Sequence, residues 1–129
     1  LFLKTLCWKI GESFLKVYNN ENSYYGAALK ERWEIEKAKN EAGEFADQAN
    51  RILLTRKLDK TTELYKAVIE GKLSKGHILA RSKRWTVKLF LAHWHHVAHW
   101  ETFGTAPPKP YVIDKLGHAH YLGPPGYNR

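Results

Sequence analysis

Residues 74–103 read SKGHILARSKRWTVKLFLAHWHHVAHWETF, the longest stretch of this chain that keeps the periodicity of an α-helix. Two apolar stripes run along it, one made of Ile78, Trp85, Leu89 and Ala92 and one of Val87, Leu91, Trp94 and Ala98. Together they cover more than half of the helix circumference, and a helix with so wide an apolar surface is usually buried. The stretch therefore predicts a long central helix, with Ser74 as its candidate N-cap.

Four shorter helices are expected before this one, at about residues 1–18, 24–39, 44–57 and 61–70. Ser23 is a candidate N-cap for the second of them, and Gly71 is the residue type favoured just past a helix end. No alternating strand pattern competes with the helical periodicity, apart from the short PYVI at residues 110–113. We therefore predict an all-α fold, a small helical domain of about five helices with one long central helix.

The core is expected where the long helix packs against the first one. The residues that carry this prediction are Trp85, Leu89, Phe90 and Trp94 on the long helix and Trp8, Ile10 and Phe14 on the first. Thinner buried stripes are expected on the second helix (Tyr25, Leu29, Trp33, Glu36) and on the third (Phe45, Ala49, Ile52, Leu53).

After Gly104 the composition changes. The last 26 residues hold all five prolines and four of the nine glycines, which is typical of an extended segment. The segment also keeps large apolar residues: Tyr111, Val112, Ile113, Leu116 and Tyr121. We therefore expect a helical domain over residues 1–104 and a Pro/Gly-rich tail over residues 105–129 that packs on the helices.

Composition limits the class of partner and the compartment. The 129 residues carry a formal charge of +8 and a pI of about 9.6, which favours polyanionic partners. No apolar run approaches the roughly 18 to 20 residues that span a membrane. Cys7 is the only cysteine, which excludes an intrachain disulfide and fits the reducing cytoplasm. The chain lacks methionine and shows helical spacing from Leu1 onward, so we interpret it as a fragment of a larger protein.

Four histidines crowd into LAHWHHVAHW, residues 91–100. His95 and His99 are four residues apart on one helix face, and His118 and His120 in GHAH offer further ligands, so a zinc site is one interpretation. The H-E-x-x-H motif of metalloproteases is absent. We expect no metal site and interpret the histidines as surface and packing groups, whose protonation near pH 6 adds positive charge.

A basic ridge precedes the histidines on the same predicted helix. Arg81, Arg84 and Lys88 are spaced three and four residues apart, and Lys75 and Lys83 flank them. Phosphate contact is the natural use of such a ridge, so these five residues are the candidate nucleic-acid-binding residues. An ordinary solvated helix face is the alternative.

Two segments resemble a known family. The first is LFLKTLCWKIGESFLK followed by SYYGAALKERWE, where the pattern falls on Lys4, Leu6, Ser23, Tyr24, Leu29, Lys30 and Glu31. The second is HILARSKRWTVKLFLAHW, where it falls on Ala80, Ser82, Lys83, Arg84, Val87 and Lys88. Both look like the C-terminal region of DEDD-type insertion-sequence transposases, the bridge-RNA-guided group that contains a helix-hairpin-helix region.

The resemblance implies a non-catalytic part of a transposase that helps to bind DNA or a guide RNA during transposition. It also implies that the catalytic acidic residues and serine lie upstream of Leu1, and that the full-length enzyme uses magnesium while this chain itself holds no cofactor. Upstream domains of the same polypeptide and a second copy of the chain are the implied protein partners. Two alternatives stay open: a histidine-rich metal-binding protein or metal-dependent enzyme, and a helical protein-interaction module.

Overall fold

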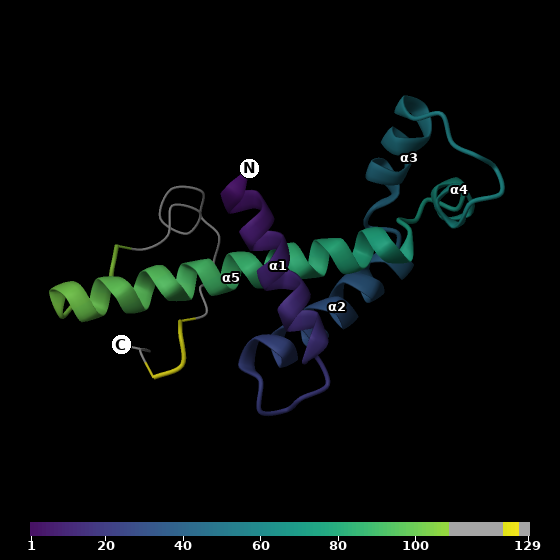
Figure 1. The fold of residues 1–129 in the computed structure, drawn as a ribbon. Coiled ribbons are helices and arrows are strands. Elements are labelled where there is room, and N and C mark those ends of the chain that lie inside the picture. The colour runs from purple at the N-terminus through teal and green to yellow at the C-terminus, as the bar shows by residue number, and fades with distance from the viewer. Residues whose placement is uncertain (109–122, 127–129) are drawn as a thin grey trace. The chain divides into compact units, whose positions relative to one another are not determined.

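The computed structural model describes residues 1–108 and 123–126, and these residues form an all-α fold (Figure 1). Its helices are α1 (Phe2–Lys16), α2 (Tyr24–Glu41), α3 (Ala46–Thr55), α4 (Glu63–Ile69) and α5 (Lys75–Phe103). The described part of the chain contains no strand. The prediction of a small all-α domain with one long helix is confirmed. Most of the expected tail, including the apolar residues from Tyr111 to Tyr121, lies outside the described residues.

Polar side chains and one glycine set the helix boundaries. The Ser23 hydroxyl accepts a hydrogen bond from the Gly26 backbone N–H at 3.1 Å, so the predicted N-cap of α2 is confirmed. At the start of α5, the Ser74 hydroxyl accepts from the His77 backbone N–H at 3.3 Å. Gly71 adopts a φ of 74° just after α4, a conformation that glycine tolerates better than other residues.

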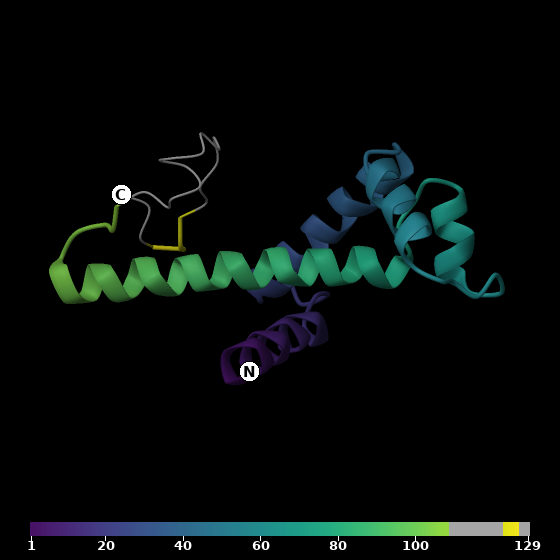
Figure 2. The same ribbon diagram turned by 90° about the horizontal axis from the view of Figure 1, so that it is seen from above.

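The chain divides into two compact units, residues 1–86 and residues 87–129, with the boundary inside α5. The core of the first unit lies at the N-terminal end of α5, where α3 and α4 also lie (Figure 2). Its buried residues are Ala49 of α3, Val68 of α4, Leu73 and Ile78. Partly buried apolar residues pack around them: Trp33, Phe45, Ile52, Leu53, Leu58 and Leu64.

This core differs from the expected one. Trp8 and Trp94 are each 64% exposed, so the prediction that they organise the core is wrong. The buried stripes predicted for α2 and α3 agree better with the structure, since Leu29 and Ala49 are fully buried and Glu36 is 2% exposed. The short helices α3 and α4 supply the apolar surface that covers the start of α5. The aromatic side chains of α1 are therefore not part of this core.

Helix α1 is attached to α2 by aromatic contacts and a close backbone approach. The rings of Phe14 and Tyr25 stack with centroids 5.2 Å apart. A Cβ atom on Gly26 would lie 2.3 Å from the carbonyl oxygen of Val17, so only glycine fits at this point of α2. An ion pair between Glu12 and Lys83 links α1 to α5.

No described helix combines the length and the apolar character that crossing a membrane requires.

Candidate nucleic-acid interface

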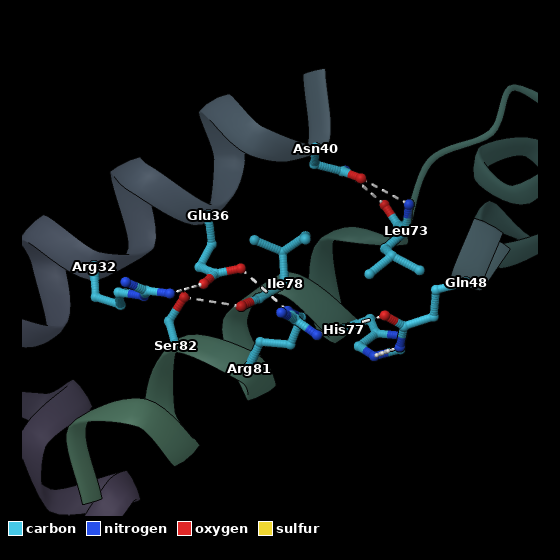
Figure 3. A network of polar contacts seen from close by, with 9 residues as sticks. All are labelled: Arg32, Glu36, Asn40, Gln48, Leu73, His77, Ile78, Arg81 and Ser82. Atoms are coloured by element: carbon cyan, nitrogen blue, oxygen red, sulfur yellow. Dashed lines mark hydrogen bonds and ion pairs between the residues drawn. The ribbon is translucent and has the colours of Figure 1, made fainter. Parts of the chain in front are cut away.

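A buried carboxylate organises the polar side of the first unit. Glu36 of α2 accepts hydrogen bonds from Arg32 Nη2 at 2.6 Å and from Arg81 Nε at 3.1 Å (Figure 3). Each guanidinium also lies over a ring, Arg32 over Trp85 at 5.0 Å and Arg81 over Phe45 at 4.4 Å. The two arginines therefore neutralise Glu36 and cover part of the aromatic surface around the core.

The two arginines also set the protonation state of Glu36. Burial by itself raises the pKa of this carboxyl, but the hydrogen bonds and charges of Arg81 and Arg32 outweigh it. The pKa of Glu36 therefore lies below its ordinary value of 4.5. Glu36 is ionised at neutral pH, and Arg32 and Arg81 compensate its negative charge.

The network continues from Arg81 to His77 through Gln48 of α3. Arg81 Nη1 lies 3.5 Å from Gln48 Oε1, and Gln48 Nε2 lies 3.4 Å from His77 Nε2 (Figure 3). We call the five residues Arg32, Glu36, Gln48, His77 and Arg81 the charged network. Because they come from α2, α3 and α5, they fix these three helices to one another.

His77 sits among positive charges. Partial burial lowers its pKa below the ordinary value of 6.5, and the charges of Arg84, Arg81 and Arg56 lower it further. Arg81 and Arg84 follow His77 by four and seven residues on α5, and Arg56 is the C-cap of α3. Three guanidinium groups from two helices therefore act on one imidazole.

A second polar contact joins α2 to the turn before α5. The buried Asn40 side chain donates to the Leu73 carbonyl oxygen at 3.0 Å and accepts from the Leu73 N–H at 2.9 Å (Figure 3). Next to it, Lys72 and Glu41 form an ion pair at 3.0 Å. The start of α5 is thereby held at the C-terminal end of α2.

The five candidate nucleic-acid-binding residues have different surroundings. Arg81 is bound to Glu36, and Lys83 is bound to Glu12, so both have partners within the protein. Lys75, Arg84 and Lys88 are exposed, and none of them forms an ion pair within the described residues. Lys75 and Arg84 belong to the first unit and Lys88 to the second.

Lys75 borders an open hollow of about 790 Å³ between α4 and the start of α5. Three lysines and three glutamates line it: Lys66, Lys72, Lys75, Glu41, Glu63 and Glu70. Because the two signs of charge are balanced there, the inside of this hollow does not favour an anion, and Lys75 stays a candidate for phosphate contact only through its exposed side. The positive surface around Arg84 and His77 is the better candidate for phosphate contact.

Sequence reasoning did not single out Arg56 or His77. Arg56 ends a different helix from the one that carries the basic ridge, and its charge acts on His77 only in the folded chain. The signal that was available is the spacing of His77, Arg81 and Arg84 at positions i, i+4 and i+7, which extends the ridge by one turn.

The histidines of residues 91–100 fall into two groups. His93 and His96 are buried, with 1% and 6% exposure, whereas His95 is exposed and its ring centroid lies 6.2 Å from that of His99. His99 Nδ1 lies 2.9 Å from the Thr105 carbonyl oxygen. No group of three or more metal-ligating side chains occurs within residues 1–108 and 123–126. His118 and His120 lie outside these residues.

Comparisons with protein-family models, with curated proteins and with solved structures found no match for this chain.

Proposed function

We propose that this chain is a non-catalytic, nucleic-acid-binding helical part of an insertion-sequence transposase. The observation that carries the proposal is Arg84, which is exposed, lies on the same face of α5 as His77 and forms no ion pair with any residue that the structure describes. Glu36, the carboxylate bound to Arg81, is already neutralised by two arginines, so it offers little opposition to an incoming phosphate.

Nucleic acid is the partner class that the charge favours. The chain carries +8 at neutral pH, and exposed arginines bind phosphate oxygens through paired N–H groups. The resemblance of HILARSKRWTVKLFLAHW to transposases supports the same class and adds the context of transposition. In that context the strand chemistry and its magnesium belong to upstream domains, and this chain contributes affinity for DNA or a guide RNA.

The salt dependence of binding tests the proposal. Affinities of the native chain for a DNA duplex and an RNA of equal length are measured by fluorescence anisotropy between about 50 and 300 mM salt, over which the Debye length falls from about 14 Å to about 6 Å. The same series is run for the double variant Lys75→Gln, Arg84→Gln. If each residue meets one phosphate, the slope of log K against log salt for duplex DNA becomes shallower by about 1.8.

A control variant separates local contact from total charge. Lys4→Gln, Lys9→Gln removes the same two charges from exposed positions on α1. We expect it to keep a slope close to that of the native chain. A Lys75, Arg84 double variant with the native slope, or equal losses in both double variants, contradicts the assignment of the interface to α5.

A protein-interaction module is the second candidate, because α1 exposes a cluster of large apolar side chains. These are Leu1, Phe2, Leu3, Leu6 and Trp8. Surface apolar groups gathered on one helix are typical of sites that contact other proteins. Sedimentation velocity of the native chain and of Phe2→Ser, Trp8→Ser tests it, and self-association lost in the variant supports this second function.

A further inference from the structure

The last turns of α5 carry two histidine rings that lie close together. His95 and His99 are four residues apart, so they lie on the same face of the helix, one turn from each other. Their ring centroids are 6.2 Å apart. His95 is exposed and His99 is half-buried, so the pair is open to an ion from solvent.

The contact between His99 and Thr105 fixes which ring nitrogen of His99 carries the proton. Gly104 follows the last residue of α5 with a φ of 72°, and the chain turns back there. His99 Nδ1 lies 2.9 Å from the Thr105 carbonyl oxygen. A carbonyl oxygen only accepts hydrogen bonds, so Nδ1 is the donor. The neutral ring therefore has its lone pair on Nε2.

A histidine held in this way is prepared to bind a metal ion. A metal-ligating imidazole usually donates its second ring N–H to a backbone carbonyl group or a carboxylate, which orients the ring. Zn–N bonds of about 2.0 to 2.1 Å place the centres of two imidazoles on one tetrahedral ion roughly 5 Å apart. Rotation of the exposed His95 side chain can close the gap of about 1 Å between this value and the present 6.2 Å.

We propose that His95 and His99 bind one divalent transition-metal ion such as Zn²⁺, with Nε2 of His99 and a ring nitrogen of His95 as its protein ligands. Imidazole suits Zn²⁺, Ni²⁺ and Cu²⁺, whereas Mg²⁺ prefers oxygen ligands. No group of three or more metal-ligating side chains occurs within residues 1–108 and 123–126, so water fills the remaining positions on the ion.

This proposal replaces the sequence-based expectation of no metal site at these two residues. The spacing of His95 and His99 is visible in the sequence, but the contact that orients His99 is not, because it depends on the turn at Gly104. The proposal does not depend on nucleic-acid binding, since both histidines and Thr105 belong to the second unit and the site needs no partner.

The bound ion links two successive turns at the end of α5. The two ligands are neighbours only while this part of the chain is helical, so the ion stabilises the helical state. At a free Zn²⁺ concentration of about ten times its Kd, amide hydrogen exchange at this helix end should slow by up to about tenfold. Protons compete with the ion for the two imidazoles, so the affinity falls as the pH is lowered.

The first experiment titrates the chain with Zn²⁺ alone by isothermal titration calorimetry at neutral pH. We expect His95→Gln and His99→Gln each to lower the Zn²⁺ affinity by at least about tenfold, because each removes one arm of the chelate. His77→Gln, on the same helix, and the tail variant His118→Gln, His120→Gln are the controls, and Mg²⁺ should give no binding heat. A Zn²⁺ affinity that is unchanged in His95→Gln and His99→Gln, or lost only in a control variant, overturns the proposal.

The second experiment follows the native chain by NMR, which avoids any loss of fold in a variant. We expect Zn²⁺ to shift the Nε2 signal of His99 while Nδ1 keeps its proton and its hydrogen bond to Thr105. Hydrogen exchange of the amides of residues 99–103 should slow with Zn²⁺ and stay unchanged with Mg²⁺. An unaltered His99 ring, coordination through Nδ1, or equal exchange rates with the two metals overturns the proposal.

Discussion

At the scale of single residues, Glu36 is the buried carboxylate of α2 that joins Arg32 of the same helix to Arg81 of α5. Its carboxylate is 2% exposed and receives both arginines, which themselves lie on aromatic rings. Removing one member of a buried ion pair leaves the others without their counter-charge, and this costs about 3 to 5 kcal/mol when all members are buried.

Replacement of Glu36 tests this role. Arg32 and Arg81 are 22% and 30% exposed, so water compensates them in part, and we expect Glu36→Ala to lower the free energy of unfolding by about 2 kcal/mol. Urea denaturation at pH 7 measures it. Glu34→Ala is the matched control on the same helix, since Glu34 is 66% exposed, and its cost should stay below about 1 kcal/mol.

The same variant has a defined pH dependence. The pKa of Glu36 in the folded chain lies below 4.5, so its contribution to stability is complete above that value. It is lost as the pH falls through the folded pKa. The gap in stability between the native chain and Glu36→Ala should therefore narrow below pH 4.5, and a gap that stays constant to pH 3 contradicts the ion-pair explanation.

At the scale of helices, the junction between α1 and α2 depends on the missing side chain of Gly26. A methyl group there meets the Val17 carbonyl group at 2.3 Å, so Gly26→Ala has to move α1 away from α2. We expect a loss of about 1 to 3 kcal/mol in thermal or urea unfolding, the usual cost of overpacking. Gly76→Ala is the control, because nothing lies within 4 Å of a Cβ atom at that helical position. It should be neutral or stabilising by up to about 1 kcal/mol.

The link between α2 and the start of α5 is equally specific. Asn40→Ala leaves the buried N–H and C=O groups of Leu73 without their partners, and each such loss costs about 1 to 3 kcal/mol. We expect a total loss of about 2 to 6 kcal/mol in urea denaturation. Asn50→Ala, at an exposed site on α3, should change stability by less than about 0.5 kcal/mol. Similar losses in the two variants would show that the contact to Leu73 contributes little.

The elements of this fold could be predicted from sequence because they depend on local spacing. The periodicity of residues 74–103 and the hydroxyl of Ser23 fixed α5 and the start of α2 to within a few residues. The environment of Arg81 could not be predicted in this way, because its partner Glu36 lies 45 residues earlier in the chain. A ridge of cations spaced three and four apart looks uniform in sequence, whereas the fold assigns Arg81 to an internal ion pair and leaves Arg84 exposed.

At the scale of the whole chain, the net charge of +8 is a better measure of the positive charge available to a partner than the total of 21 lysines and arginines. Several lysines and arginines are paired with glutamates inside the first unit, among them Arg32, Arg81, Lys72 and Lys83. The cations that remain for a partner include Lys75, Arg84 and Lys88. For the nucleic-acid binding proposed above, this division predicts a salt slope that corresponds to a few phosphate contacts and not to more than twenty.

The two hydrogen bonds between Asn40 and Leu73 also bear on how this architecture can vary among related chains. The segment from Glu41, at the end of α2, to Lys72, before α5, has its two ends close together. An ion pair joins Glu41 to Lys72, and the hydrogen bonds between Asn40 and Leu73 lie next to it. A change in the length of this segment would leave the contacts of Asn40 with Leu73 and of Glu41 with Lys72 in place. In a relative that lacks α3 and α4, the positions of Trp33 and Ile78, which pack in the core with those helices, should carry polar residues.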